Sequence, residues 1–260
     1  LTDVTGVQTC ALPISITLIW EDIVYSKMYL TGGIGATGGN EGFAAPYVLP
    51  NLTAYCETCA SIGNIFTNHR LFLLHGESKY IDILEKTLYN SMLSGVSLSA
   101  DRFFYPNPLE SDGRHKRSEW FGCACCPSNV ARFVPAIPGY IYALSDKDLY
   151  INLFISNEAE FNIGKISVKV VQEANFPWDG KVNITMSTGK PAKFGVKIRI
   201  PGWAQNVAIP GDLYKFDDKV NEPFSISVNG EPVTSVPVNG YAEIEDRKST
   251  RLNSSHVSQS

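Results

Sequence analysis

Three of the six cysteines of this chain stand within four residues, at Cys123, Cys125 and Cys126. A thiolate is a soft metal ligand and also a strong nucleophile, so a cluster of this kind favours a metal site or covalent catalysis. The clustering does not resemble the spaced cysteines of a disulfide framework. Pro127 follows the cluster and is typical of the start of a helix. We therefore interpret the cluster as a metal site that also carries a nucleophile.

Glu57 and Cys59 are candidate ligands from an earlier part of the chain. Inside a helix, residues two apart point about 200° away from each other and cannot share a metal, whereas at the first turn of a helix they can. The metal interpretation thus requires a helix to begin at this motif. The alternative is that Cys56 and Cys59 are small buried side chains of a helix. Because closed zinc sites are tetrahedral, a site with Glu57 and Cys59 leaves one downstream cysteine unused.

A lone carboxylate, Glu41, lies in a glycine-rich loop that spans residues 32–50. This loop is too long to be a simple connection, which makes it a candidate functional loop. Gly39 and Gly42 allow the backbone to approach a ligand closely, and Phe43 is placed to exclude water from the carboxyl group. The alternative is an ordinary solvated glutamate, and the residue type alone does not decide between the two.

Helices should position these residues. The apolar periodicity predicts helices over residues 18–30, 57–75, 79–93 and 127–144. Pro135 and Pro138 should interrupt the last of them. Helices joined by loops that carry the chemistry are typical of part of an all-helical barrel or toroid.

From residue 146 the apolar period changes from helical to alternating. This pattern predicts strands over residues 150–154, 160–163, 165–171, 181–186, 193–200 and 224–228. Asn229 and Gly230 predict a hairpin with residues 231–233, since both turn residues must adopt a positive φ. About 100 residues of short strands favour an antiparallel β-sandwich. The boundary between the two domains should therefore fall near residue 145.

Composition restricts the class of partner. The net charge of −4 argues against a general nucleic-acid binder, and no apolar run is long enough to predict a membrane span. The hydrophobic share of 44% is that of a protein with a folded core. We therefore expect a small-molecule or glycan partner.

The two ends of the chain, residues 1–15 and 247–260, resemble the conceptual translation of sequencing-adapter DNA. We exclude both from the fold, so Cys10 is not counted as a ligand and His256 belongs to no site. The composition of the second segment predicts disorder. The native sequence would then be residues 16–246, an internal piece of a longer protein.

Glu57-Thr58-Cys59, followed by Cys125-Cys126-Pro127, resembles the zinc motif of the β-L-arabinofuranosidases of glycoside hydrolase family 127. The resemblance extends over residues 16–246, through the segments 27–35 and 198–203. It implies an α+β multidomain fold. Residues 16–145 would be the C-terminal part of an (α/α)6 catalytic barrel, and residues 146–246 a β-sandwich domain.

The same resemblance implies the site residues. Zinc would be held by Glu57, Cys59, Cys125 and Cys126, whose ligand atoms should lie within about 4 Å of each other. Cys125 would be the nucleophile and Glu41 the acid/base of a retaining reaction that passes through a thioglycosyl intermediate. The substrate would carry β-L-arabinofuranose, in arabino-oligosaccharides or glycoproteins, and we expect a bacterial enzyme of carbohydrate metabolism.

Two aromatic residues are candidate substrate contacts. Tyr105 lies in a proline-containing loop, and its hydroxyl would contact the sugar or the nucleophilic sulfur. Trp120 stands beside the cysteines and would form a wall of the sugar site. The alternative for both is core packing.

Two rival functions remain at this stage. One is a purely structural zinc site in a helical scaffold or carbohydrate-binding protein. The other is a related glycosidase that acts on another furanoside. The sequence leaves open the compartment, homo-oligomerisation and whether this chain is active by itself.

Overall fold

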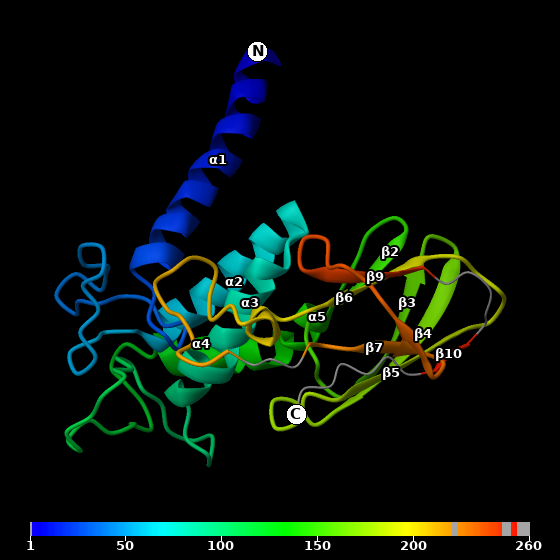
Figure 1. Cartoon of the computed structure of the whole chain (residues 1–260). Helices are drawn as coiled ribbons and strands as arrows, with labels where there is room; N and C mark the ends of the chain where they lie inside the picture. Colours follow the sequence, from blue (N-terminus) through cyan, green and yellow to red (C-terminus); the bar gives the residue numbers. More distant parts are fainter. Residues whose placement is uncertain (1, 220–222, 246–250, 254–260) are drawn as a thin grey trace. The chain divides into compact units, whose positions relative to one another are not determined.

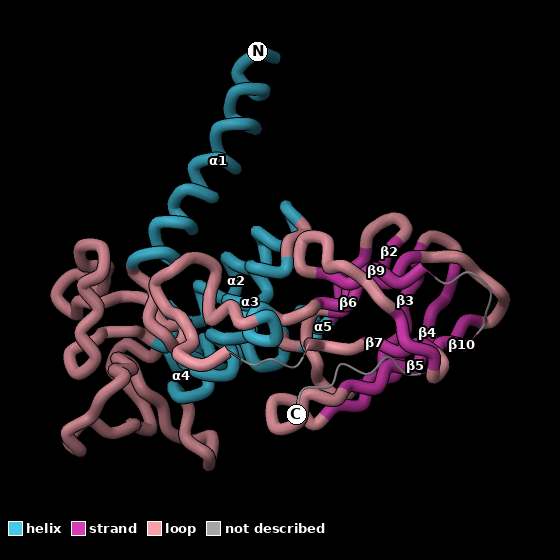
Figure 2. Tube along the Cα trace, viewed as in Figure 1, coloured by secondary structure: helices cyan, strands magenta, loops and turns pink. Residues whose placement is uncertain are grey.

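The computed structural model describes residues 2–219, 223–245 and 251–253, with the helices in the first part of the chain and the strands after them (Figures 1 and 2). The chain divides into two compact units. Unit 1 comprises Leu1–Leu74, Asp82–Pro135 and Ile209–Lys215, and unit 2 comprises His75–Ile81, Ala136–Ala208 and Phe216–Ser260. None of the helices in the described ranges is both long and apolar enough to cross a membrane.

Helix α1 (Thr2–Ser26) begins and ends earlier than the predicted helix over residues 18–30. Its last residues give way to a turn, in which the Gly32 amide donates to the Tyr29 carbonyl at 2.8 Å. Gly32 has a φ of 81°, so the chain reverses there and Met28 pairs with Ile34 in a short antiparallel bridge. The prediction of helix for residues 27–30 was therefore wrong.

Helix α2 (Thr58–His75) begins at the candidate ligand motif, as the metal interpretation requires. Cys56 has a φ of 39°, which no helix can contain, and the Ser61 amide donates to the Glu57 carbonyl at 3.0 Å. Glu57 is thus the residue that caps the helix, and Cys59 belongs to its first turn.

Helix α3 (Ser78–Thr87) is shorter than its predicted span and continues as a π-helical turn, η1 (Leu88–Met92), and a 3-10 turn, η2 (Leu93–Gly95). Gly95 lies against α2. A Cβ atom at this glycine would stand 2.6 Å from the Thr58 hydroxyl oxygen, so only glycine fits this close approach.

The predicted helix over residues 127–144 is broken where its prolines stand. It consists of α4 (Cys125–Phe133), the 3-10 turn η3 (Val134–Ala136) and α5 (Pro138–Ile141). The predicted interruption is confirmed, but α4 begins two residues before Pro127, and the last predicted helical residues form strand β1 (Tyr142–Leu144) instead.

Unit 2 contains two four-stranded sheets and a two-stranded hairpin (Figure 1). The first sheet has the order β1-β2-β6-β9, with β2 (Asp148–Ile151), β6 (Gly195–Arg199) and β9 (Tyr241–Glu245). The second has the order β10-β5-β4-β3, with β3 (Asn157–Ile163), β4 (Ile166–Ala174), β5 (Val182–Thr188) and β10 (Arg251–Asn253). The short helix η4 (Gly202–Gln205) follows β6.

The expectation of purely antiparallel pairing was wrong for one pair, because β2 and β6 are parallel. The chain between them builds β3, β4 and β5 of the other sheet before it returns, which is the long crossover that a parallel pair needs. The remaining pairs in the described residues are antiparallel.

The hairpin of β7 (Ile226–Val228) and β8 (Glu231–Val233) is confirmed. Its turn residues Asn229 and Gly230 have φ values of 54° and 87°. The strand β10 was not predicted, since it lies in the segment expected to be disordered. It pairs with β5 and is thus an edge strand of the second sheet. The other residues of that segment lie outside the described ranges.

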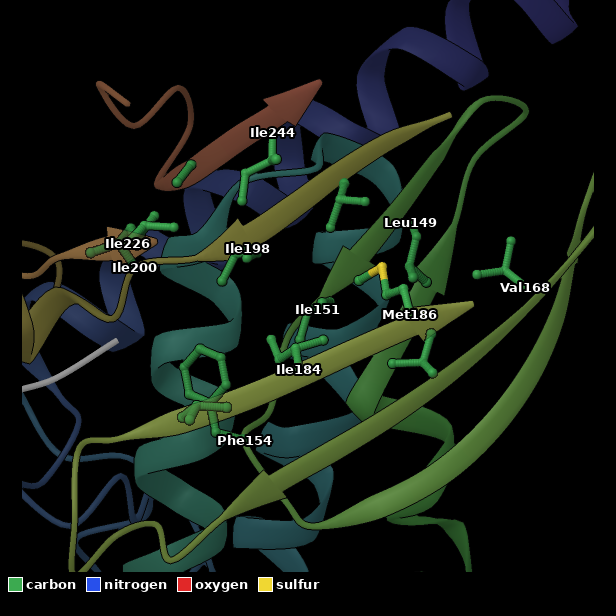
Figure 3. Packing of buried hydrophobic residues seen from close by; sticks show 14 of the residues in the cluster. Leu149, Ile151, Phe154, Val168, Ile184, Met186, Ile198, Ile200, Ile226 and Ile244 are labelled. Carbon is green, nitrogen blue, oxygen red and sulfur yellow. The ribbon is translucent and has the colours of Figure 1, made fainter. Parts of the chain in front are cut away.

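The core of unit 2 is apolar and is formed by inward-facing side chains of both four-stranded sheets (Figure 3). Its members alternate along the strands with exposed residues, as in the burial pattern of β5. They include Leu149, Ile151, Val168, Ile184, Met186 and Ile198. The alternating period predicted from the sequence after residue 146 thus corresponds to strands with one face in this core.

Candidate active site and metal centre

The carboxylate of Glu57 and the thiols of Cys59, Cys125 and Cys126 lie together in unit 1, with one ligand atom of each within 4.8 Å of the others. The Cys125 sulfur stands 3.4 Å from Glu57 Oε1 and 3.8 Å from the Cys126 sulfur. The Cys126 sulfur stands 3.5 Å from Glu57 Oε1. Since metal–ligand bonds of about 2.0–2.3 Å place tetrahedral ligand atoms within roughly 4 Å of one another, this set fits a metal ion with little adjustment.

Two helix starts bring these residues together. Glu57 and Cys59 stand at the start of α2, and Cys125 and Cys126 are the first two residues of α4. The amide groups of a first helical turn have no partner inside the helix and stabilise negative charge, which suits thiolates and a carboxylate.

Aromatic packing aligns the two helices. Phe66 of α2 meets Phe133 of α4 edge to face, with ring centroids 5.8 Å apart. The Arg132 guanidinium of α4 lies over the Phe66 ring at the same distance. These contacts lie about two turns from the ligand residues on each helix and fix the relative position of the helix starts that carry the ligands.

Burial disfavours the charged form of two of the thiols. Burial raises the pKa of Cys59 to about 11, and burial also raises the pKa of Cys126 well above that of a free thiol. Repulsion from the neighbouring Cys125 adds to both shifts. A bound cation would reverse this effect, because it favours the thiolate that coordinates it. The donor set therefore fits a soft or borderline divalent metal.

Cys56 and Cys123 are not members of the cluster. Cys56 is fully buried and packs with Tyr29, Ala36 and Ala54, and its burial raises its pKa to about 12. Cys123 is exposed, although it stands only two residues before Cys125. Both cysteines, which the family resemblance leaves out of the ligand set, therefore lie outside the cluster.

Asn129 is a site residue that sequence reasoning missed. Its side chain hydrogen-bonds the Cys59 thiol and lowers its pKa, in opposition to the larger effect of burial. The Arg132 guanidinium in turn donates to Asn129 Oδ1 at 2.5 Å. A signal was present, since Asn129 follows Cys125 by one helical turn and so faces the same side.

Replacing Asn129 with alanine should lower the affinity of the chain for Zn²⁺ by about 10-fold, because partners that orient metal ligands typically contribute this much or more. Competition with a chelating dye measures the effect. The exposed Asn51 is a suitable control, and its replacement with alanine should leave the affinity unchanged. Equal affinities of the Asn129 variant and the unaltered chain would contradict the prediction.

Glu41 lies on the tight turn between the two strands of a short bridge, in the loop between α1 and α2. The Gly42 amide donates to the Thr37 carbonyl and the Thr37 amide donates back to the Gly42 carbonyl, both at 3.1 Å. Glu41 has a φ of 50° and an exposed side chain. The turn therefore leaves the Glu41 side chain accessible to solvent.

Two tyrosines connect Glu41 to Cys125. The Tyr55 hydroxyl donates to Glu41 Oε1 at 2.8 Å. The Tyr55 ring lies beside the Tyr105 ring, with centroids 6.4 Å apart, and the Tyr105 hydroxyl interacts with the Cys125 thiol. This interaction with Cys125 is the largest cause of the raised pKa of Tyr105, whereas burial is the largest cause of the raised pKa of Tyr55. The two candidate catalytic groups thus lie at opposite ends of one polar chain.

The two predicted aromatic contacts differ in their surroundings. Tyr105 is half-buried, and its ring packs edge to face on Phe121 with centroids 5.5 Å apart. Its carbonyl accepts the Thr58 amide at 3.1 Å, which ties this loop to the start of α2. Trp120 is 65% exposed. Its indole is therefore free to meet a ligand.

An open cavity of about 630 Å³ borders Tyr55 on the side of the loop that carries Pro106 and Pro108. Charged and polar side chains line it, among them Glu110, Arg114 and His115. Groups of this kind hydrogen-bond hydroxyl-rich ligands. The cavity therefore adds a polar region next to the residue that contacts Glu41.

Models of two known protein domains match most of the chain. The model of the β-L-arabinofuranosidase GH127 catalytic domain matches residues 9–139, and the model of the GH127 middle domain matches residues 148–253. The four clustered residues, Glu41 and the two tyrosines all fall within the first match.

A curated relative and several solved structures are also similar. The chain is 38% identical to the non-reducing end β-L-arabinofuranosidase of Bifidobacterium longum subsp. longum, over 85% of this chain and 33% of the relative. It superimposes on a GH127 β-arabinofuranosidase at 48% identity and a TM-score of 0.87, covering 92% of this chain and 38% of that one. A GH127 β-L-arabinofuranosidase from Geobacillus stearothermophilus T6 gives 36% identity and a TM-score of 0.81, covering 92% and 37%. The chain thus spans about a third of the length of the curated relative.

Proposed function

This chain belongs to the β-L-arabinofuranosidases of glycoside hydrolase family 127, and from this premise we propose that it carries the metal site, the nucleophile and the acid/base of a zinc-dependent retaining glycosidase. The proposed enzyme releases β-L-arabinofuranose from arabino-oligosaccharides or glycoproteins. The observation that carries the proposal is the convergence of one carboxylate and three thiols from two helix starts.

The proposal includes the architecture. Residues 16–145 would be part of an (α/α)6 barrel and residues 146–246 a β-sandwich domain. The helices α1 and α2 support the first part, because both expose large apolar side chains such as Leu18, Ile19, Leu73 and Leu74. Exposed apolar helix faces of this kind are suited to packing against further helices.

Zinc is the metal that best suits one carboxylate and three thiolates, and when bound it would hold the thiols deprotonated at neutral pH. Glu57, Cys59, Cys125 and Cys126 would hold it. Asn129 orients Cys59 by its hydrogen bond, so the ligand set has support beyond the ligands themselves.

Cys125 is the proposed nucleophile. Its sulfur would attack the anomeric carbon of the sugar and form a thioglycosyl bond, while the bond to the leaving oxygen breaks. The Tyr105 hydroxyl interacts with this thiol and would orient the sulfur toward the sugar. Cys126 is fully buried, which suits a ligand that stays in place.

Glu41 is the proposed acid/base. Its carboxyl group would protonate the departing oxygen and, in the second step, take a proton from the water that cleaves the thioglycosyl bond. Two displacements at the same carbon retain the configuration. Tyr105 and the exposed Trp120 are the proposed sugar contacts, and the cavity beside Tyr55 would receive the leaving group.

A chimera tests the proposal, because the chain spans about a third of the length of the curated relative. In this chimera, the chain replaces the matching third of the Bifidobacterium longum protein. With Zn²⁺ it should hydrolyse nitrophenyl β-L-arabinofuranoside faster than other nitrophenyl furanosides, and a chelator should abolish turnover. The first product observed by NMR should be the β anomer.

Two outcomes would favour the rival functions. A zinc-loaded chimera that hydrolyses none of the furanosides points to a structural zinc site. Faster hydrolysis of a different furanoside points to a related glycosidase with another substrate.

A further inference from the structure

Tyr55 is a residue that neither the sequence reasoning nor the proposed mechanism uses, yet it makes the closest contact to the proposed acid/base. Its hydroxyl donates to Glu41 Oε1 at 2.8 Å. We propose that Tyr55 is the positioning residue that holds the Glu41 carboxyl group for proton transfer to the leaving oxygen. This inference rests on the proposed function.

Glu41 requires such support because of where it stands. Its side chain is exposed, on a turn with a φ of 50°. Within the described residues the Tyr55 hydroxyl is the one group that hydrogen-bonds its carboxylate. An exposed glutamate loses rotamer freedom when it is held in one orientation, and correct orientation accounts for a large part of catalytic rate.

Tyr55 itself is firmly held. Its carbonyl accepts the Asn107 amide at 2.8 Å, and the amide of the next residue, Cys56, donates to the Gly35 carbonyl at 2.8 Å. The side chain of Cys56 is fully buried. These contacts fix the backbone on both sides of the tyrosine.

The ring of Tyr55 is also fixed. A Cβ atom at Gly38 would lie 3.3 Å from Tyr55 Cδ2, so this glycine lets the Glu41 turn pack closely on the ring. On its other side the ring meets Tyr105, with centroids 6.4 Å apart. The hydroxyl is therefore presented at a defined position relative to the turn.

The same segment also carries a proposed metal ligand. Glu57 follows Tyr55 by two residues, and the left-handed backbone of Cys56 lies between them. Because one short segment holds both the ligand and the partner of the acid/base, Tyr55 sets the position of Glu41 relative to the cluster that contains Cys125.

The hydrogen bond assigns roles to the two oxygens of Glu41. With Oε1 bound to the tyrosine, Oε2 carries the proton. In the first step the Oε2–H bond breaks, an O–H bond forms on the leaving oxygen, and the electron pair of the broken glycosidic bond stays on that oxygen. Glu41 becomes negative during this transfer, so the bond from Tyr55 turns charge-assisted and strengthens.

Replacement of Tyr55 with phenylalanine in the zinc-loaded chimera tests the inference. Phenolate leaves poorly unless it is protonated, so the phenyl substrate depends on a well-positioned acid. Its kcat/KM, that for phenyl β-L-arabinofuranoside, should therefore fall about 10-fold to 100-fold. Dinitrophenolate leaves without a proton, so kcat/KM for the dinitrophenyl substrate should change less than about threefold. Tyr47, which is 67% exposed, is the matched control, and its replacement with phenylalanine should alter neither value.

The two substrates separate the inference from its rivals. An equal loss on both would mean that Tyr55 is only structural, and no loss on either would mean that Glu41 needs no positioning; each result overturns the inference. If the unaltered chimera hydrolyses neither substrate, this result contradicts the proposed function itself and not the role of Tyr55.

A second measurement is independent of hydrolysis. In the chain labelled with ¹³C at the glutamate carboxyl carbons, replacement of Glu41 with glutamine identifies its NMR resonance. Replacement of Tyr55 with phenylalanine should shift that resonance and leave those of distant glutamates, such as Glu173, in place. An unshifted Glu41 resonance would overturn the inference whatever the activity.

Discussion

Replacing Cys125 with alanine should lower kcat/KM of the zinc-loaded chimera for nitrophenyl β-L-arabinofuranoside by at least about 10³-fold, because removal of a covalent nucleophile leaves only the catalysis that binding and electrostatics supply. The reason lies in the cluster. The Cys125 sulfur is the thiol that Tyr105 contacts, and it is half-buried, whereas Cys126 is fully buried. Of the two thiols, that of Cys125 is therefore the more accessible.

One control variant and one measurement on the unaltered chimera make this result specific. Replacement of the exposed Cys123 with alanine should leave kcat/KM unchanged, since this thiol lies outside the cluster. Mass spectrometry of the unaltered chimera, quenched during turnover of the dinitrophenyl substrate, should find the sugar attached to the peptide that contains Cys125. Undiminished hydrolysis by the Cys125 variant would remove the nucleophile assignment and leave this residue as a ligand at most.

Replacing Glu41 with glutamine should lower kcat/KM for phenyl β-L-arabinofuranoside by about 10²-fold to 10⁴-fold, the range that general acid catalysis supplies. Glutamine has the same shape as glutamate, and its side-chain oxygen accepts the hydrogen bond from the Tyr55 hydroxyl. Its amide group, however, has no acidic proton to transfer to the leaving oxygen. The loss should be much smaller for the dinitrophenyl substrate, because that leaving group needs no proton. Steady-state rates on the two substrates give the comparison.

Azide tests the role of Glu41 in the second step, the hydrolysis of the thioglycosyl intermediate. With Glu41 replaced by alanine and the dinitrophenyl substrate, the thioglycosyl intermediate should accumulate because no base activates water. Azide needs no base, so it should restore turnover and give a β-arabinosyl azide. Replacement of Glu173, an exposed residue of β4, with alanine is the control and should leave rates unaltered. Absence of azide rescue would argue against the acid/base role.

The sequence determined much of the local structure. Apolar periodicity located the cores of the helices and most strands, and Asn229-Gly230 gave the hairpin with its positive φ values. These signals are local, since they depend on which residues fit one period or one turn. For the same reason the short strands β1, β9 and β10 were missed, because they exist only where a neighbouring strand offers backbone partners.

The candidate ligands were identified from their residue types, together with a requirement on where a helix must begin. Glu57 and Cys59 can share a metal only if a helix begins between Cys56 and Cys59, and α2 begins at Thr58. The sequence did not show the cause of that start. It is the left-handed backbone of Cys56, whose amide donates to the Gly35 carbonyl far back in the chain.

The tertiary structure alone decided which groups surround the clustered cysteines. It placed Cys123 in solvent and Cys56 in the core, and it brought Asn129 and Tyr55 to the ligands and to Glu41. The chemistry of a thiol or a carboxylate can be read from its type. Its role depends on partners tens of residues away, because hydrogen bonds and metal sites join atoms that are close in space and not in sequence.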